Sequence, residues 1–183
     1  MFAGNRTRLL VTVLVGLMLL PAGAVGAPAP APHSTGESAL MKALLRSREL
    51  WATIDVCSPA DQPNTVGVRG SMPGDKHAHD KMYMRFRLQY MNTATKKWVD
   101  LSSARSGGFV FVGPGSDVRQ GGRSFQLVPR PGKPAADLRG VVEYQWRRGK
   151  SVMQSISRPT SAGHKSLAGA DPAGYSAATC SIG

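Results

Sequence analysis

The stretch from residue 81 to residue 91 holds the most regular alternation of apolar and polar positions in the chain. Its apolar members occupy every second position and are Met82, Met84, Phe86, Leu88 and Tyr90. The positions between them are Tyr83, Arg85, Arg87 and Gln89. Because successive side chains of an extended backbone point to opposite faces, this pattern predicts a β-strand with one buried face and one solvated, basic face.

Shorter segments with strand-like patterns, separated by turn residues, precede and follow this stretch. Further strands are predicted at 51–57, 66–72, 97–101, 109–112, 124–127, 138–147, 151–157 and 175–182. The run at 109–112 is apolar throughout, which predicts a strand buried on both sides, and Trp98 is expected in the core. Arg148-Gly149-Lys150 suits a hairpin turn.

One helix is predicted, at residues 34–48. Ser34 and Glu37 have capping-box spacing, and Leu40, Ala43 and Leu44 share a face. Such a short helix is expected to pack over an open end of the domain. Together the elements predict an all-β fold, an immunoglobulin-like antiparallel β-sandwich of about 8 strands with one short helix before it.

The first residues have the layout of a secretory signal peptide. Arg6 and Arg8 precede an uncharged apolar run at 9–20, which ends at Pro21 and is followed by small residues. Cleavage is expected after Ala24, which makes 1–24 the leader, with a site near 27 as the alternative. The predicted organisation continues with a proline-alanine linker and the helix at 25–49 and the β-domain at 50–183. No integral membrane segment is expected after processing, so the protein is expected to be secreted or associated with the cell envelope.

The two cysteines are expected to form a disulfide. Cys57 closes the first predicted strand and Cys180 lies in the last. In the oxidising environment outside the cytoplasm, an isolated pair is more often a disulfide than a nucleophile or half of a metal site. A pair of buried thiols is the alternative.

The chain is strongly basic, with a formal net charge of +12, which falls to +10 once the two arginines of the leader are removed. Such a surface attracts polyanions, although a compositional bias toward arginine, glycine and alanine would produce the same charge. Six basic residues are the candidate polyanion-binding set: Arg85, Arg87, Arg139, Arg147, Arg148 and Lys150. If their strands share a sheet, the arginines form a stripe that can hold phosphate, sulfate or carboxylate groups; the alternative is an ordinary solvated sheet face.

Five segments of the predicted domain carry a resemblance to known sequences. They lie at 50–53, 70–74, 82–87 and 138–142, and in the ending at 163–180. In these segments the chain resembles a group of exported bacterial proteins of uncharacterised function that have a single immunoglobulin-like or fibronectin-like domain. The resemblance covers 50–183 and implies secretion and fold, but no activity, substrate or catalytic residue.

Catalytic and cofactor motifs are absent from the sequence. There is no Gly-x-Ser-x-Gly elbow and no phosphate-binding glycine loop, so no cofactor and no catalytic residues are expected. The weak candidate for a metal site is His77, His79 and Asp80, because an extended His-x-His places both imidazoles on one side. Three such ligands leave a zinc site incomplete, and a solvated loop is the simpler interpretation.

These patterns favour a monomeric, non-enzymatic binding or adhesion module of the cell envelope, whose partner is an anionic envelope polymer contacted through the basic sheet face. The alternative is a structural protein that binds another envelope protein through an apolar strand edge. A small secreted hydrolase that uses the loop at 77–80 is a third reading.

Overall fold

A computed structural model of the chain describes residues 35–102, 107–129, 131–164 and 168–183. The predicted signal peptide, its cleavage site, the proline-alanine linker and Ser34 of the expected capping box lie outside these residues. The helix and strands belong to the compact unit that begins at residue 33.

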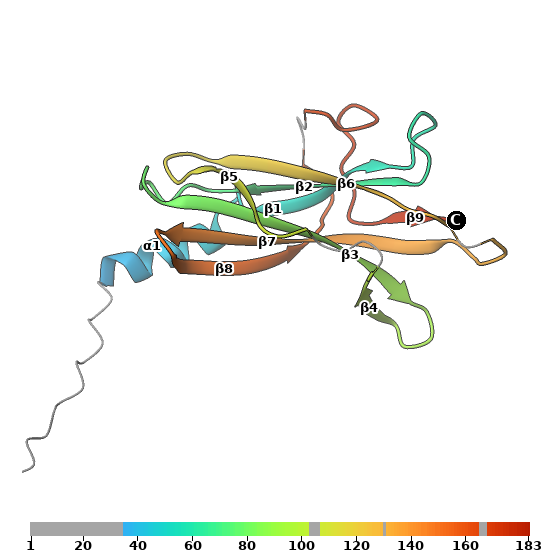
Figure 1. The fold of residues 1–183 in the computed structure, drawn as a ribbon, viewed down its shortest axis with the longest axis horizontal. Coiled ribbons are helices and arrows are strands. Elements are labelled where there is room, and N and C mark those ends of the chain that lie inside the picture. Colours follow the sequence, from blue (N-terminus) through green and yellow to red (C-terminus); the bar gives the residue numbers. More distant parts are fainter. Residues whose placement is uncertain (1–34, 103–106, 130, 165–167) are drawn as a thin grey trace, which may run out of the picture. The chain divides into compact units, whose positions relative to one another are not determined.

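The described residues form one helix and nine strands, all of which are labelled in Figure 1. The helix is α1 (Thr35–Arg46). The strands are β1 (Trp51–Cys57), β2 (Thr65–Met72), β3 (Lys81–Asn92), β4 (Lys97–Asp100), β5 (Val110–Pro114), β6 (Arg119–Gln126), β7 (Ala136–Arg148), β8 (Ser151–Pro159) and β9 (Cys180–Ile182).

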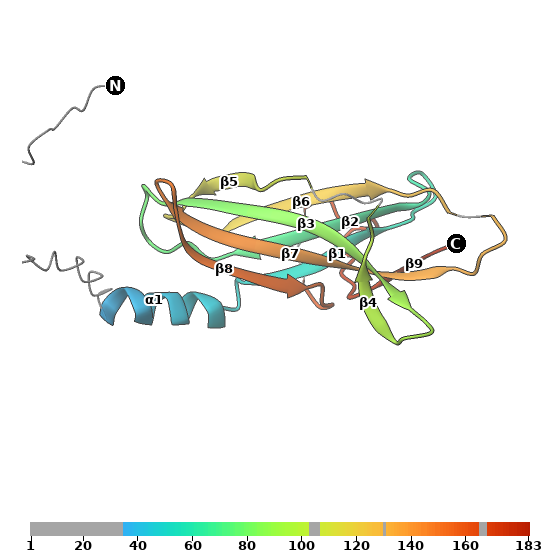
Figure 2. The same cartoon turned by 60° about the horizontal axis from the view of Figure 1, so that its bottom comes forward.

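The strands make two antiparallel sheets. The smaller sheet has the order β1-β2-β6. The larger sheet has the order β4-β3-β7-β8, with β5 paired to β3 and β9 paired to β7. The long strands β3 and β7 lie side by side over much of their length in both views (Figures 1 and 2), with Arg85 opposite Glu143 in the register. The prediction of a mostly antiparallel β fold with one short helix is confirmed.

One hydrophobic core lies between the two sheets. The alternation predicted for β3 is confirmed, since its apolar positions from Met82 to Leu88 are buried and the positions between them are half-buried. From β7, Val142, Tyr144 and Trp146 enter the same core. The core residues that the smaller sheet contributes are Ala52, Ile54, Val66, Val68, Met72 and Phe125.

Two apolar segments that are expected to be buried lie partly exposed. Val110 and Phe111 of β5 are both 52% exposed, so the apolar run at 109–112 is not buried on both sides. The reason is that β5 pairs only with β3 and lies at the margin of the sheet. Trp98 is only half-buried and belongs to the short strand β4, outside the core cluster.

The helix packs against the domain through its last turns. Leu44 is buried, and Leu40, Met41 and Leu45 contact the core cluster. Arg158 of β8 donates a hydrogen bond to the carbonyl oxygen of Leu45 at 3.0 Å. Among the described residues, no helix has the length and apolarity needed to cross a bilayer.

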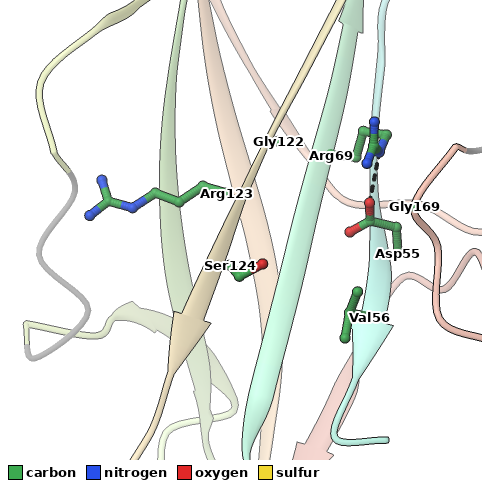
Figure 3. Close-up of a pocket in the computed structure, with 7 residues that line it drawn as sticks. All are labelled: Asp55, Val56, Arg69, Gly122, Arg123, Ser124 and Gly169. Atoms are coloured by element: carbon green, nitrogen blue, oxygen red, sulfur yellow. Dashed lines mark hydrogen bonds and ion pairs between the residues drawn. The ribbon is translucent and has the colours of Figure 1, made fainter. Parts of the chain in front are cut away.

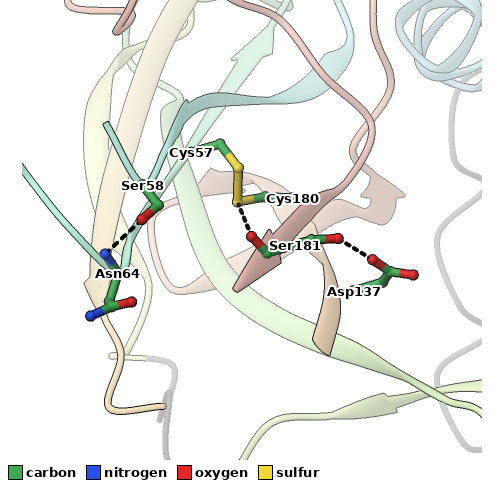
Figure 4. The surroundings of a disulfide bond; sticks show 6 residues. All are labelled: Cys57, Ser58, Asn64, Asp137, Cys180 and Ser181. Atoms are coloured by element: carbon green, nitrogen blue, oxygen red, sulfur yellow. Dashed lines mark hydrogen bonds between the residues drawn. A yellow bond between two sulfur atoms is a disulfide. The ribbon is translucent and has the colours of Figure 1, made fainter. Parts of the chain in front are cut away.

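The disulfide between Cys57 and Cys180 is confirmed, and it joins the end of β1 to the start of β9 (Figure 4). The two cysteines are 123 residues apart in the sequence. Ser181, beside the bridge, donates a hydrogen bond to Asp137 of β7. The bridge therefore links the small sheet to the large one at the point where the chain ends.

The segment before Cys180 is mostly not the strand predicted at 175–182, because regular pairing with β7 begins at Cys180. Residues 171–177 instead run along the open side of β1. The N–H of Ile54 donates to Ala177 at 2.9 Å, and the N–H of Ala177 donates back at 3.0 Å. The N–H of Asp171 donates to the carbonyl of Asp55 at 2.9 Å. We call residues 171–177 the β1 cover.

Candidate functional site

The outward face of β3 and β7 carries four of the six basic residues predicted for polyanion binding. Arg85 and Arg87 point outward from β3, and Arg139 and Arg147 point outward from β7, because each alternates with buried core residues. The register places Arg139 opposite Gln89 and Arg147 opposite Lys81. We call the surface formed by these four arginines and the rings beside them the arginine face. Its rings belong to Tyr83, Trp98 and Phe109.

Each ring of the arginine face lies under at least one guanidinium group. Arg147 lies 4.2 Å from the ring centre of Tyr83 and 4.8 Å from that of Phe109. Arg85 lies over Phe109 at 4.9 Å, and Arg139 lies over Trp98 at 4.5 Å. A guanidinium stacked on a ring is attracted to its negative face and keeps the edges of its plane available for hydrogen bonds.

Three of the guanidinium groups donate some of their N–H groups to neighbouring side chains, which fix their orientation. Arg85 donates through Nε to Glu143 at 3.1 Å and also through Nη2. Arg139 donates through Nε to Gln89 at 2.8 Å. Arg147 donates to Gln145 from Nε at 2.8 Å and Nη2 at 2.6 Å. A guanidinium has five N–H donors, and these bonds use only Nε and Nη2. The Nη1 groups of the three arginines therefore have no hydrogen-bond partner among the described residues.

Arg87 is held at the β4 end of the face. Its Nη1 donates to Asp100 at 2.7 Å, and the Asp100 side chain is 56% exposed. Ion pairs that open to solvent contribute at most about 1 kcal/mol, so this pair orients Arg87 without fixing it strongly. Partial burial lowers the pKa of Arg139 from its ordinary value, because desolvation disfavours the charged form.

Arg148 and Lys150 do not join the other four residues. Arg148 donates to Asp80 from Nε at 2.9 and 3.1 Å and from Nη2 at 2.7 Å. Lys150 lies in the exposed turn between β7 and β8. The candidate set therefore divides into a group of four on the sheet face and two residues at its end.

The sequence pattern does not predict two aromatic members of the face, since it places Phe109 in a buried strand and Trp98 in the core. Both side chains are half-buried and lie beneath guanidinium groups. Phe109 and Phe111 are two residues apart, so a period-two interpretation places both rings on one face. The Phe111 ring packs against that of Tyr83, with 5.6 Å between centres, as this period requires.

A second cluster of chemically active side chains lies in the loop between β2 and β3. Asp75, His77 and Asp80 each place one ligand-type atom within 4.8 Å of the other two. His79, the other histidine of the predicted metal candidate, is exposed and lies outside this cluster. Asp75 takes its place, because Lys76 adopts a φ of 71° and the backbone N–H of His77 donates to Asp75 Oδ1 at 3.0 Å.

The two carboxyl groups of this loop differ in their electrostatic environment. Asp75 is fully buried, and burial is the main reason why its pKa is raised, with its contact to Asp80 raising it further. The pKa of Asp80 is lowered, mainly by the hydrogen bonds from Arg148. Asp75 Oδ2 has no hydrogen-bond partner among the described residues. The loop thus keeps a buried carboxyl group under conditions that disfavour its charge.

We predict that Asp75→Asn raises the free energy of unfolding at pH 7 by about 1 kcal/mol. The variant removes the cost of an unpaired buried polar atom, which is of this size. With its raised pKa, Asp75 holds its proton to higher pH in the folded protein than in the unfolded chain. Its contribution to stability therefore falls as pH rises above the ordinary value of 3.8. An asparagine stays neutral and offers an N–H to Asp80.

Urea unfolding at pH 4 and pH 7 measures this effect. The difference between the Asp75→Asn variant and the unaltered protein should be larger at pH 7 than at pH 4. Asp61→Asn is the matched control, because Asp61 is exposed and should change stability little at either pH. An Asp75→Asn variant that is less stable at pH 7 contradicts the prediction.

A shallow pocket of about 250 Å³ lies on the outer face of the small sheet. Figure 3 shows its lining, in which Arg69 is paired with Asp55 at 2.7 Å and Arg123 points away from that pair. The floor includes Gly122 and Ser124 of β6. Because its charged groups are paired or diverge, this pocket presents no converging set of functional groups.

The loop that follows β8 places one serine beside one histidine. Ser161 Oγ and His164 Nε2 are 3.1 Å apart, and the His164 ring is stacked on Trp51 at 4.4 Å. Burial lowers the pKa of His164. Asp171 is held on the β1 cover, where its carboxylate accepts a hydrogen bond from Gln62, and no ion pair joins it to His164 in the described part of the chain. No acid therefore orients this histidine in the manner of a catalytic triad.

Comparisons with protein-family models, with curated proteins and with solved structures find no match for this chain.

Proposed function

We propose that this protein is a secreted, non-enzymatic binding or adhesion module of the cell envelope that contacts acidic polymers through the arginine face. The observation that carries the proposal is the stacking of Arg85, Arg139 and Arg147 on aromatic rings. A guanidinium already held in place loses less side-chain freedom when it binds an anion. The unengaged Nη1 groups can donate to phosphate, sulfate or carboxylate oxygens.

The proposal includes an immunoglobulin-like sandwich as the scaffold. In the lettering of such domains, the order β1-β2-β6 corresponds to A-B-E, and the order β4-β3-β7-β8 corresponds to C′-C-F-G. This correspondence supports the assignment, as does the single core between the two sheets. The arginine face then lies on the sheet that contains strands C and F.

Secretion is supported by two independent features. The N-terminal sequence has a basic start, an apolar run and small residues in the order of a signal peptide. Disulfides such as Cys57–Cys180 form and persist mainly in oxidising compartments and are rare in the cytosol. Both fit a protein that acts outside the cytoplasm, where acidic wall and matrix polymers are abundant.

We predict that the double variant Arg85→Gln/Arg147→Gln elutes from heparin and from isolated cell wall at lower salt than the unaltered protein. Each lost contact with a polymer anion should reduce the slope of log affinity against log salt by roughly 0.7 to 0.9, the range measured for nucleic acid phosphates. Two contacts then reduce the slope by about 1.5. Retention across a salt gradient, on heparin, DNA and cell wall, measures the change.

The matched control removes the same charge elsewhere. Arg46 and Arg48 are exposed at the end of α1 and just after it, and Arg46→Gln/Arg48→Gln should change retention much less. Equal losses in the two double variants would mean that retention reports net charge alone, and the arginine face would not be the binding site. Comparison among the three polymers identifies the preferred anion class.

A partner-binding role is the second candidate, and the exposed residues of β5 favour it. Val110 and Phe111 are both 52% exposed at the margin of the large sheet, where another protein could cover them. Electrostatic binding of a polyanion weakens as the salt concentration rises, whereas an apolar contact between two proteins persists. Specific co-purification of an envelope protein at high salt, lost on Phe111→Ser, would favour this role over polymer binding.

A further inference from the structure

We propose that Asp75, His77 and Asp80 form a binding site for one divalent transition-metal ion of the zinc class. Three ligands of two chemical types, two carboxylates and one imidazole, lie within 4.8 Å of one another in a single loop. This site is separate from the arginine face and does not depend on its function.

Asp75 supplies the observation that points to a ligand. Its side chain is fully buried, its Oδ1 accepts a hydrogen bond from the N–H of His77, and its Oδ2 has no partner in the described structure. A buried carboxylate oxygen without a donor is unfavourable. The carboxyl groups of Asp75 and Asp80 also lie within hydrogen-bond reach of each other, so a cation between them would contact the free oxygen of Asp75 and the carboxylate of Asp80 together.

The backbone around the cluster leaves room for the carboxylate. A Cβ atom added to Gly115 would collide with Asp75 Oδ1 and lie 2.7 Å from the carbonyl oxygen of His77. The N–H of Gly115 also donates to the carbonyl of Asp80 at 2.8 Å. The segment after β5 therefore forms one wall of the cluster, and a glycine is required there.

Arg148 fits the role of an outer residue that orients a ligand. Its hydrogen bonds to both oxygens of Asp80 fix the plane of that carboxylate, as ligating carboxylates are commonly fixed in metal sites. Asp80 Oδ2 accepts from both Nε and Nη2 of Arg148, whereas Oδ1 accepts one bond from Nε. Since each carboxylate oxygen has two lone pairs, Oδ1 keeps one for the metal. The guanidinium also limits the local negative charge to about one unit.

The donor types select the ion. Calcium and magnesium prefer oxygen ligands, whereas imidazole nitrogen suits zinc, copper, nickel and iron. Zinc binds imidazole and carboxylate ligands at about 2.0–2.2 Å, so two ligand atoms of a tetrahedral site lie about 3.4 Å apart. Contraction of the cluster by roughly 1.4 Å brings its widest separation to this value. The His77 side chain is 53% exposed, so it can move this far, and its open side leaves a coordination position for water.

The test uses the protein purified without a polyhistidine tag and titrated with Zn²⁺ by calorimetry and with Co²⁺ by visible absorption. We expect one ion per chain and Co²⁺ bands of a low-coordinate site. His77→Ala should weaken Zn²⁺ binding at least tenfold, because replacing even a residue that only supports a ligand commonly lowers metal affinity by this factor. Asp75→Asn should weaken it similarly. His79→Ala is the matched control in the same loop and should stay within twofold.

Several outcomes overturn the proposal. They are the absence of Zn²⁺ binding to the unaltered protein, an equal loss on His77→Ala and His79→Ala, and Ca²⁺ binding in place of Zn²⁺. His77 is exposed, so its replacement should leave folding intact, and the circular dichroism spectrum of each variant checks this. If Asp75→Asn alone keeps full Zn²⁺ affinity, the buried carboxylate is not a ligand and the site as described is wrong.

Discussion

Replacing both cysteines of the Cys57–Cys180 bridge with alanine is expected to lower the free energy of unfolding by about 4–5 kcal/mol. The bridge closes a loop of 123 residues, and the entropy that the unfolded chain loses through a closed loop of this length corresponds to about 4.9 kcal/mol. For a domain of this size, such a loss lowers the melting temperature by roughly 10–20 °C.

Thermal and urea unfolding of the oxidised protein and of the Cys57→Ala/Cys180→Ala variant measure this difference. A reductant provides the control, because it should shift the unaltered protein toward the variant and leave the variant unchanged. A difference in melting temperature of less than about 3 °C between the two proteins would contradict the prediction. It would mean that the disulfide does not destabilise the unfolded chain relative to the folded protein.

The second large effect is expected at Trp146. Its side chain is fully buried in the core, and its indole N–H donates to the carbonyl of Pro73 at 2.9 Å. Trp146→Ala should lower the free energy of unfolding by about 3–5 kcal/mol, the range for removal of a large aromatic side chain. Trp146→Phe retains most of the ring volume but leaves the Pro73 carbonyl unpaired, which should cost about 1–3 kcal/mol.

Urea unfolding followed by far-ultraviolet circular dichroism separates the two contributions. Trp98→Ala is the comparison, since it removes the same side chain from the half-buried surface and should cost much less. If Trp146→Ala prevents folding altogether, the phenylalanine variant still reports the hydrogen bond. Equal stability of Trp146→Phe and the unaltered protein would show that the bond to Pro73 contributes nothing.

The sequence pattern predicted the elements that are long and pack on one face. The pattern predicts β3 and β7 correctly because a buried and a solvated face alternate along them. The β7–β8 turn was predicted from Gly149, which adopts a φ of 56°. The disulfide was predicted from the number of cysteines and the expected compartment.

Non-local pairing explains what the pattern missed. Alternation places Arg85 on a face but does not reveal that Phe109, 24 positions along the chain, lies beneath its guanidinium. Arg148 pairs with Asp80 across 68 residues, and no local signal indicates this contact. The metal candidate contained His79 in place of Asp75 because a regular extended loop was assumed. The left-handed conformation of Lys76 overrides that assumption.

The β1 cover has a consequence for behaviour in solution. Without residues 171–177, β1 would be an outer strand with unsatisfied N–H and C=O groups, which is a template for pairing with another chain. The hydrogen bonds between Ile54 and Ala177 occupy part of this template. Because the cover leads directly into Cys180, opening the disulfide removes its covalent anchor and leaves only the short pairing of β9 with β7 to hold it. Reducing conditions should therefore promote intermolecular strand pairing and aggregation in addition to loss of stability.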